Sequence, residues 1–252
     1  MSSFPDHFSG VAGAYAEHRP RYPDRLFAWL AELPAGRKLA WDCATGSGQA
    51  AVGLADRFDR VIATDASEAQ IAAAVAHGRV EYRVAPAESS GLASDSADLV
   101  AVGQALHWFD RPAFYAEARR VLRPDGVVAA WTYGHSFLGD PRADAALRRF
   151  YSETVGPYWP PERALVDAGY RTLEFPFDEI AAPEIAMEAE WPLAAFLGYV
   201  GTWSAVTRFR AERGFDPVAT LAEELRPHWG DAAVPRRIRW PLAIRAGRLL
   251  KE

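Results

Sequence analysis

A glycine-containing segment and the acid that follows it carry the most specific chemistry in this sequence. Residues 38–49 read Lys-Leu-Ala-Trp-Asp-Cys-Ala-Thr-Gly-Ser-Gly-Gln, and residues 61–65 read Val-Ile-Ala-Thr-Asp. Gly46 and Gly48 can take backbone angles closed to other residues and, lacking a Cβ, let a ligand lie against the main chain. Asp65 can accept hydrogen bonds from both hydroxyls of a ribose. The glycine pair alone is equally typical of a tight turn, but the acid at the next strand end favours a nucleotide-binding crevice.

The elements that must position these residues alternate between strand and helix. The periodicity of apolar residues and the turn signals predict helices over 24–33, after Gly48, over 67–78 and over 110–122. Strands are predicted just before the glycine turn and at 61–65, 80–84, 98–102 and 127–132, with Arg123-Pro-Asp-Gly126 as a turn. Strands separated by helices predict a parallel α/β sheet, doubly wound and Rossmann-like, with helices on both faces.

After Tyr133 the pattern changes to proline-interrupted helical pieces, which hold five of the nine tryptophans: Trp159, Trp191, Trp203, Trp229 and Trp240. We predict helices at 163–168, 192–206 and 216–225, and strands at 170–180 and 236–245. This half is expected to complete the same sheet and to carry helical insertions over its edge, where substrate selectivity would lie.

Composition excludes several classes of protein. The 252 residues, half of them hydrophobic, allow one core and a small additional lobe. The net charge of −5, without a run of Lys or Arg, argues against nucleic acid or an anionic membrane as the main partner. Cys43 is the only cysteine, so neither an internal disulfide nor a cysteine-based zinc site is expected, and we expect no metal. No apolar run approaches the ~20 residues of a membrane-spanning helix, and we expect a cytoplasmic protein.

The motifs together resemble a known family. They are Asp42-Cys-Ala-Thr-Gly-Ser-Gly48, Asp65, Ala87-Glu88, Gln104-Ala-Leu-His-Trp-Phe109 and Leu122-Arg-Pro-Asp-Gly126. This set resembles the class I S-adenosylmethionine-dependent methyltransferases, and the leader Tyr15–Pro23 is similar to that of the trans-aconitate and other small-molecule (type 11) methyltransferases. The resemblance implies a seven-stranded sheet with an antiparallel last strand. It implies one domain over 1–252, with a lid and helix at 1–36, a cofactor-binding half at 37–133 and sheet completion plus helical insertions at 134–252.

The resemblance also implies roles for individual residues. The loop Ala44, Thr45, Gly46, Ser47 and Gly48 would lie under the methionyl part of the cofactor, with Asp42 supporting the loop and the amino group. Asp65, next to Ala66, would take the ribose; Ala87 and Glu88 would border the adenine; Gln104 and Ala105 would lie beside the sulfonium. Two residues depart from the pattern. Ala44 replaces the usual first glycine, which predicts a negative φ there, and Pro86 replaces the usual acid before the Ala-Glu pair.

The leading hypothesis is methyl transfer from S-adenosylmethionine, giving S-adenosylhomocysteine, to a small molecule, with a carboxylate as the first candidate acceptor. His107 is the candidate base, needed for an alcohol but not for a carboxylate; packing beside Trp108 and Phe109 is the alternative role. Arg19 and Tyr22 can close over the cofactor or bind an acceptor carboxylate, or simply form a surface arm. Trp108 and Trp203 are candidates for the acceptor pocket, although tryptophans at helical spacing more often belong to a core.

Two other classes of function remain as alternatives. A nicotinamide-dependent dehydrogenase would share the strand, loop and acid, but it normally has a third glycine soon after the second, and residues 49–52 contain none. A protein that binds the cofactor without catalysis, as a partner to another chain, would have the same first half. Turnover of an acceptor would distinguish it from an enzyme.

Overall fold

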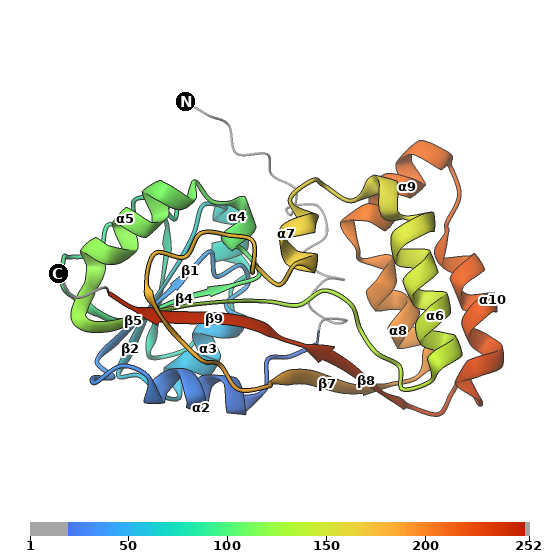
Figure 1. Ribbon diagram of the computed structural model, residues 1–252, viewed down its shortest axis with the longest axis horizontal. Helices are drawn as coiled ribbons and strands as arrows, with labels where there is room; N and C mark the ends of the chain where they lie inside the picture. Colours follow the sequence, from blue (N-terminus) through green and yellow to red (C-terminus); the bar gives the residue numbers. More distant parts are fainter. Residues whose placement is uncertain (1–19, 250–252) are drawn as a thin grey trace.

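The computed structural model describes residues 20–249, and a seven-stranded sheet forms its centre (Figure 1). The strand order is β3-β2-β1-β4-β5-β9-β6, and β1 to β5 run parallel. The last strand, β9, is antiparallel to β5, as predicted. The strands of both sheets are β1 (Leu39–Cys43), β2 (Arg60–Asp65), β3 (Val80–Val84), β4 (Ala97–Gly103), β5 (Leu122–Thr132), β6 (Asp178–Ile180), β7 (Ala186–Trp191), β8 (Arg236–Pro241) and β9 (Ala243–Arg248).

Helices cover both faces of this sheet. Consecutive residues of the central strands point to opposite faces, and on both faces these side chains are apolar and buried. Ala40, Leu99 and Ala101 face α2 (Asp24–Glu32) and α3 (Gln49–Ala55). Their neighbours Trp41, Val100 and Val102 belong to a second buried cluster with α5 (Arg111–Val121). At the start of α5, the Asp110 carboxylate accepts a hydrogen bond from the Ala113 amide at 3.2 Å, as expected of a helix cap. The doubly wound α/β prediction is thus confirmed.

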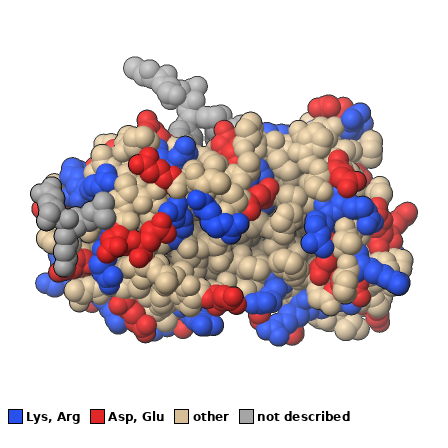
Figure 2. Space-filling model, viewed as in Figure 1, with Lys and Arg blue, Asp and Glu red and all other residues tan. Residues whose placement is uncertain are grey.

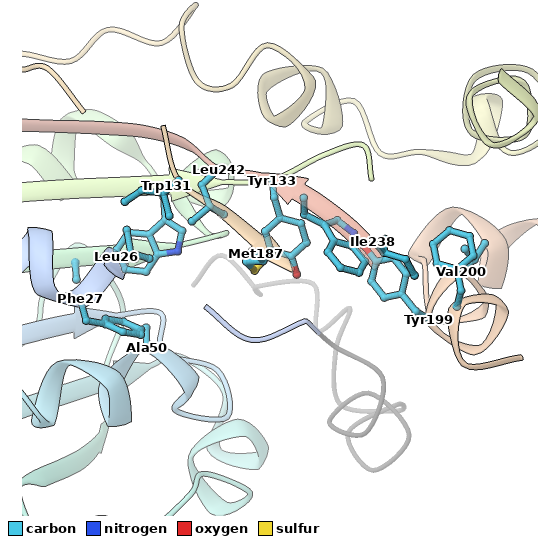
Figure 3. Packing of buried hydrophobic residues seen from close by; sticks show 14 of the residues in the cluster. Leu26, Phe27, Ala50, Trp131, Tyr133, Met187, Tyr199, Val200, Ile238 and Leu242 are labelled. Atoms are coloured by element: carbon cyan, nitrogen blue, oxygen red, sulfur yellow. The ribbon is translucent and has the colours of Figure 1, made fainter. Parts of the chain in front are cut away.

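The second half of the chain adds a group of helices beyond the sheet (Figure 1). They are α6 (Pro141–Arg149), α8 (Leu193–Gly201), α9 (Ser204–Arg213) and α10 (Val218–Trp229). A two-stranded sheet of β7 and β8 connects them to the main sheet. Figure 3 shows one buried cluster passing from Leu26 and Trp131 through Met187 to Tyr199, so the helical group and the sheet share a hydrophobic core.

Two strand predictions in the second half were wrong in extent. Of residues 170–180 only Asp178–Ile180 form a strand, β6. Tyr170 has φ +59°, which no strand accommodates, and the carbonyl oxygens of Tyr170 and Leu173 accept hydrogen bonds from the Arg245 guanidinium. The single strand predicted at 236–245 is two strands, because β8 pairs with β7 whereas β9 pairs with β5.

Several helix predictions also needed correction. The helix predicted at 192–206 is interrupted at Thr202 and Trp203, which separate α8 from α9. The predicted helix at 216–225 is α10, which starts at Val218 and continues to Trp229 despite Pro227. The helix predicted at 67–78 ends at Ala72 as α4 (Glu68–Ala72). α6 was not predicted at all.

The predicted turn at 123–126 lies instead within β5, where the pairing with β4 shifts register. Short elements complete the chain: η1 (Leu106–Trp108), the π-helical turn η2 (Phe150–Thr154), η3 (Gly156–Tyr158) and α7 (Arg163–Asp167).

Basic and acidic side chains are interspersed over the face seen in Figure 2. Between residues 20 and 249, no helix is both long and apolar enough to cross a membrane. The same residues contain no group of three or more His, Cys, Asp or Glu side chains arranged to hold a metal ion.

Candidate active site

The loop after β1 is held in a left-handed conformation by hydrogen bonds to its neighbours. The Thr45 amide donates to the Thr64 carbonyl oxygen of β2 at 2.9 Å, and the Thr45 hydroxyl donates to Asp42 Oδ2 at 2.5 Å. Ala44 has φ +56°, so the predicted negative φ was wrong. Ala44 keeps the backbone conformation that a glycine would adopt easily, at a steric cost of about 1 kcal/mol.

Asp65 joins the end of β2 to the same loop. Its Oδ2 accepts from the Gly46 amide and its Oδ1 accepts from the Ser67 amide, both at 2.9 Å. A carboxylate has about four lone-pair sites, so two remain for another donor. Gly46 has φ +56°, and the nearest atom to the position of a Cβ there is Gln70 Oε1 at 3.8 Å. The loop is therefore open on the side where Gly46 lacks a side chain.

Gly48, in contrast, is small because a tyrosine lies against it. A Cβ on Gly48 would lie 2.3 Å from the Tyr82 hydroxyl oxygen. That hydroxyl donates to the Val75 carbonyl oxygen at 2.7 Å, and the Val75 amide donates to the Ser47 carbonyl oxygen at 3.2 Å. The sequence analysis expected a ligand to approach the backbone at both glycines, but at Gly48 the close neighbour is Tyr82.

Three carboxylates gather at the ends of β1 to β3. Asp42 is 1% exposed, and its pKa is raised to about 7, chiefly by burial and to a smaller extent by the charge of Asp65, against hydrogen bonds that lower it. Burial and the charges of Asp42, Glu88 and Asp65 raise the pKa of the Cys43 thiol well above its usual value. These three acids therefore lie close enough to Cys43 to act on it electrostatically, and they make the electrostatic potential at the carboxyl ends of β1 to β3 negative.

Gln104 directly follows β4 and has a left-handed backbone conformation, with φ +57°. Its Nε2 donates to the Tyr133 carbonyl oxygen at 2.9 Å, and its Oε1 accepts from the Thr132 hydroxyl and from the Tyr133 amide. These contacts fix the side chain against β5, so Gln104 contributes its backbone, together with buried Ala105, to the edge of the sheet.

The adenine-side residues predicted after β3 lie between β3 and α5. Ala87 is buried, and Glu88 Oε1 accepts from the Asp110 amide at 3.1 Å. Ala66, after Asp65, is exposed.

His107 is held by a tyrosine that the sequence analysis missed. His107 Nδ1 and the Tyr170 hydroxyl oxygen are 2.8 Å apart, and the His107 ring lies 4.8 Å from the Trp108 ring. Tyr170 is fully buried, and its hydroxyl also bonds to Thr132. No local pattern marks Tyr170, because the turn after α7 brings it to His107 from 63 residues away. Burial, and then the charge of Arg163, lowers the pKa of His107 to about 3, so the ring is neutral at physiological pH.

Trp203 belongs to an aromatic cluster on the helical side of this edge. Its ring centroid is 5.7 Å from that of Tyr151 and 5.8 Å from that of Trp159. Arg163, a residue that the sequence analysis also missed, places its guanidinium 4.5 Å from the Trp159 ring. Arg163 is the charge that acts on His107, so it connects the cluster electrostatically to the end of β4.

The leader lies partly within the described residues. The Tyr22 amide donates to Gln49 Oε1 at 3.0 Å, and the Tyr22 ring packs edge-on against Trp131 at 5.5 Å. Gln49 is the first residue of α3, directly after the glycine loop. Arg19, the other leader residue in the prediction, lies outside the described residues.

The predicted cofactor residues Asp42, Gly46 and Asp65 lie together at one edge of the sheet. The space beside Gly46 is open, Asp65 keeps two acceptor positions, and the Asp42 carboxyl is buried. Gly46 and Asp65 are already joined by a hydrogen bond, which fixes these groups relative to one another before a ligand binds.

Comparison with known proteins agrees with this geometry. Residues 41–130 match the family described as "Methyltransferase domain". A Dictyostelium discoideum protein named as a methyltransferase is 34% identical over 227 residues, covering 89% of this chain and 86% of that protein. The methyltransferase cfoB of Aspergillus candidus is 32% identical over 203 residues, covering 70% of this chain and 60% of that protein.

A solved structure of similar sequence extends the match over most of the chain. This Anaeromyxobacter dehalogenans protein, described as a type II methyltransferase, is 53% identical, with a TM-score of 0.88; the alignment covers 93% of this chain and 99% of that one. The match to this structure covers both halves of the chain, and both halves contribute strands to the seven-stranded sheet with its antiparallel last strand. The chain therefore belongs to the class I S-adenosylmethionine-dependent methyltransferases.

Proposed function

We propose that this methyltransferase acts on a small molecule and transfers the methyl group to a carboxylate oxygen. The observation that supports this acceptor is the state of His107. With its pKa lowered to about 3, the imidazole is a weak base at neutral pH. An alcohol must lose a proton during methyl transfer, whereas a carboxylate, with a reference pKa near ~4, is already ionised. A weak base beside the end of β4 therefore suits an acceptor that needs none.

We assign the cofactor to the carboxyl edge of β1, β2 and β4. In this proposal the loop from Ala44 to Gly48 contacts the methionyl part, Asp42 pairs with the amino group and Asp65 binds the ribose hydroxyls. Ala87 and Glu88 lie along the adenine. Gln104 and Ala105 lie beside the sulfur. Bound S-adenosylmethionine supplies a methyl group already activated by its sulfonium charge, so the chain needs to orient the acceptor and exclude water.

We further propose that His107 orients the acceptor as a neutral group, held in place by Tyr170. The leader acts as a cover: Pro20 to Pro23 lie next to α3, where Tyr22 bonds to Gln49 and packs on Trp131. In this proposal residues 1–252 work as one domain, in which 1–36 cover the cofactor and 134–252 supply the acceptor side. A truncation beginning at Asp24 that kept full cofactor affinity and activity would remove the leader from this account.

Incubation of the protein with methyl-labelled S-adenosylmethionine and a pool of small metabolites tests the proposal. We expect label in a small-molecule fraction and release of that label as methanol by mild base, which hydrolyses esters. An Asp65→Ala variant is the control and should give at least about tenfold less labelled product at a cofactor concentration below the dissociation constant. A product stable to mild base contradicts a carboxylate acceptor, and label found only in protein or nucleic acid contradicts a small molecule.

A further inference from the structure

Arg163 is a mostly buried cation at the junction of the sheet and the helical group. It opens α7, and its side chain is 19% exposed. The guanidinium lies 4.5 Å from the Trp159 ring centroid and 5.2 Å from that of Tyr151. A long charged side chain seldom loses most of its water without a partner, so the contacts of each nitrogen decide what Arg163 can do.

Among the residues that the structure describes, only the Nε edge of the guanidinium makes hydrogen bonds. Arg163 Nε donates to the Tyr151 hydroxyl and to Asp167 Oδ1, the latter at 3.2 Å. Asp167 also accepts from the Tyr151 hydroxyl at 2.6 Å, and its own side chain is 35% exposed. Between residues 20 and 249 neither Nη1 nor Nη2 donates a hydrogen bond to another residue, which leaves four N–H groups for a ligand.

The unused edge lies beside the proposed acceptor position. Arg163 Nη2 is 3.7 Å from where a Cβ on Gly134 would lie, next to the chain leaving β5. The same charge acts on His107, which follows β4, and on Tyr170, which follows α7 and lies 2.8 Å from His107 Nδ1 through its hydroxyl oxygen. The guanidinium therefore lies near the end of β4 rather than on a remote surface.

Aromatic rings surround this cation on the helical side. Tyr151, Trp159 and Trp203 lie with ring centroids 5.0 to 5.8 Å apart, and His135 lies 4.1 Å from Tyr151. Flat rings beside a two-pronged cation suit a ligand with an apolar or unsaturated body and a planar anionic group.

Resting on the proposed function, we propose that Arg163 binds a carboxylate of the acceptor through Nη1 and Nη2, with the acceptor body against Trp159 and Trp203. Arg163 then selects acids over their neutral analogues. Asp167 and Tyr151 hold the Nε edge, so that the Nη edge keeps a fixed direction.

Pairs of ligands that differ only in charge test this assignment. Cinnamate and cinnamamide, and phenylacetate and phenylacetamide, are titrated by calorimetry into the protein saturated with S-adenosylhomocysteine. The wild-type protein should prefer each acid over its amide by about 10- to 100-fold, the range of a charge-assisted bidentate contact. Arg163→Gln should bind acid and amide equally. Arg142→Gln, which removes an exposed arginine on α6, should keep the wild-type preference.

Arg163→Lys covers the case in which the Gln variant does not fold. Lysine keeps the positive charge but lacks the two parallel N–H groups of the guanidinium. The preference of this variant for the acid over the amide should therefore be at least about fivefold smaller than that of the wild-type protein. Equal binding of acid and amide by the wild-type protein, no binding of either acid at millimolar concentration, or an unchanged preference in Arg163→Lys or Arg163→Gln would overturn the assignment. Titration with S-adenosylhomocysteine alone keeps the two proposals separate. Failure at that step removes the proposed cofactor site, whereas success there without a preference for acids removes only the role of Arg163.

Discussion

Asp42 should make cofactor binding depend on pH in the neutral range. Burial raises its pKa to about 7 in the free protein, so the carboxyl is largely protonated at pH 6 and largely ionised at pH 8. If Asp42 pairs with the amino group of the cofactor, only the ionised form binds well. Binding then lowers the pKa of Asp42 and releases a proton, and affinity rises with pH until the carboxylate is fully formed.

The size of this effect follows from the pKa. With a pKa of about 7, the ionised fraction falls about tenfold between pH 8 and pH 6, and apparent affinity falls by the same factor. This corresponds to about 1.4 kcal/mol. The dependence should continue at about tenfold per pH unit below pH 6 and level off above pH 8.

Calorimetric titration with S-adenosylhomocysteine at pH 5.5 to 8.5, in buffers of different ionisation enthalpy, measures both affinity and proton release. Asp42→Asn should bind more weakly at pH 8 and show no slope. Asp65→Asn is the matched control, because it should weaken binding and keep the slope, with the midpoint at a lower pH since the charge of Asp65 no longer raises the pKa of Asp42. An affinity that does not change between pH 6 and pH 8, or a slope that persists in Asp42→Asn, would refute the pairing.

Other predictions concern stability and the role of His107. At pH 8, Asp42→Asn should be more stable than the wild type by up to about 4 kcal/mol in urea unfolding. The raised pKa of Asp42 gives a contribution that is complete below pH 3.8 and lost as pH rises through 7, so an advantage that does not shrink toward pH 4 would contradict this burial cost. Ala44→Gly should raise stability by about 0.5–1 kcal/mol in the same assay, since it relieves the positive φ; a destabilised variant would argue against that conformation. Gly48→Ala should cost roughly 1–3 kcal/mol, and Tyr82→Phe should recover part of it by removing the closest atom, whereas a neutral Gly48→Ala would show that Tyr82 moves freely. His107→Gln should keep the single-turnover rate within about tenfold of the wild-type rate. The plot of the wild-type rate against pH should show no inflection from His107 between pH 5 and pH 8; an inflection that disappears in the variant would show that His107 acts as a base.

The first half of the fold could be predicted from sequence because its signals are local. β1, β2 and β4 are short, mostly apolar strands close to turn residues, and their alternation with helices predicts a parallel order. The acids at the ends of β1 and β2 then lie at one edge of the sheet, which is why Asp42 and Asp65 could be placed before the structure. The positive φ of Ala44 could not be predicted from the sequence, because the hydrogen bonds of Thr45 to β2 and to Asp42 hold the loop in this conformation.

The second half depends on contacts between residues far apart in the sequence. The segment 236–245 mixes arginines with apolar residues throughout and serves two sheets, and only the partners β7 and β5 decide where it divides. Tyr170 reaches His107, and Arg245 takes the carbonyl oxygens that a strand at 170–176 would have used. Arg163 carries no motif either. Its proposed role follows from the aromatic rings beside its guanidinium and from the two Nη atoms that bond to none of the described residues.

The most direct test of the site is calorimetric titration of the purified protein with S-adenosylmethionine and S-adenosylhomocysteine, with NADPH titrated in parallel and Asp65→Ala as the control. The account predicts micromolar binding of both adenosyl ligands by the wild-type protein, a loss of at least about tenfold in the variant and no binding of NADPH. Adenosyl binding that is unchanged in Asp65→Ala would contradict the assignment of the cofactor to the ends of β1, β2 and β4.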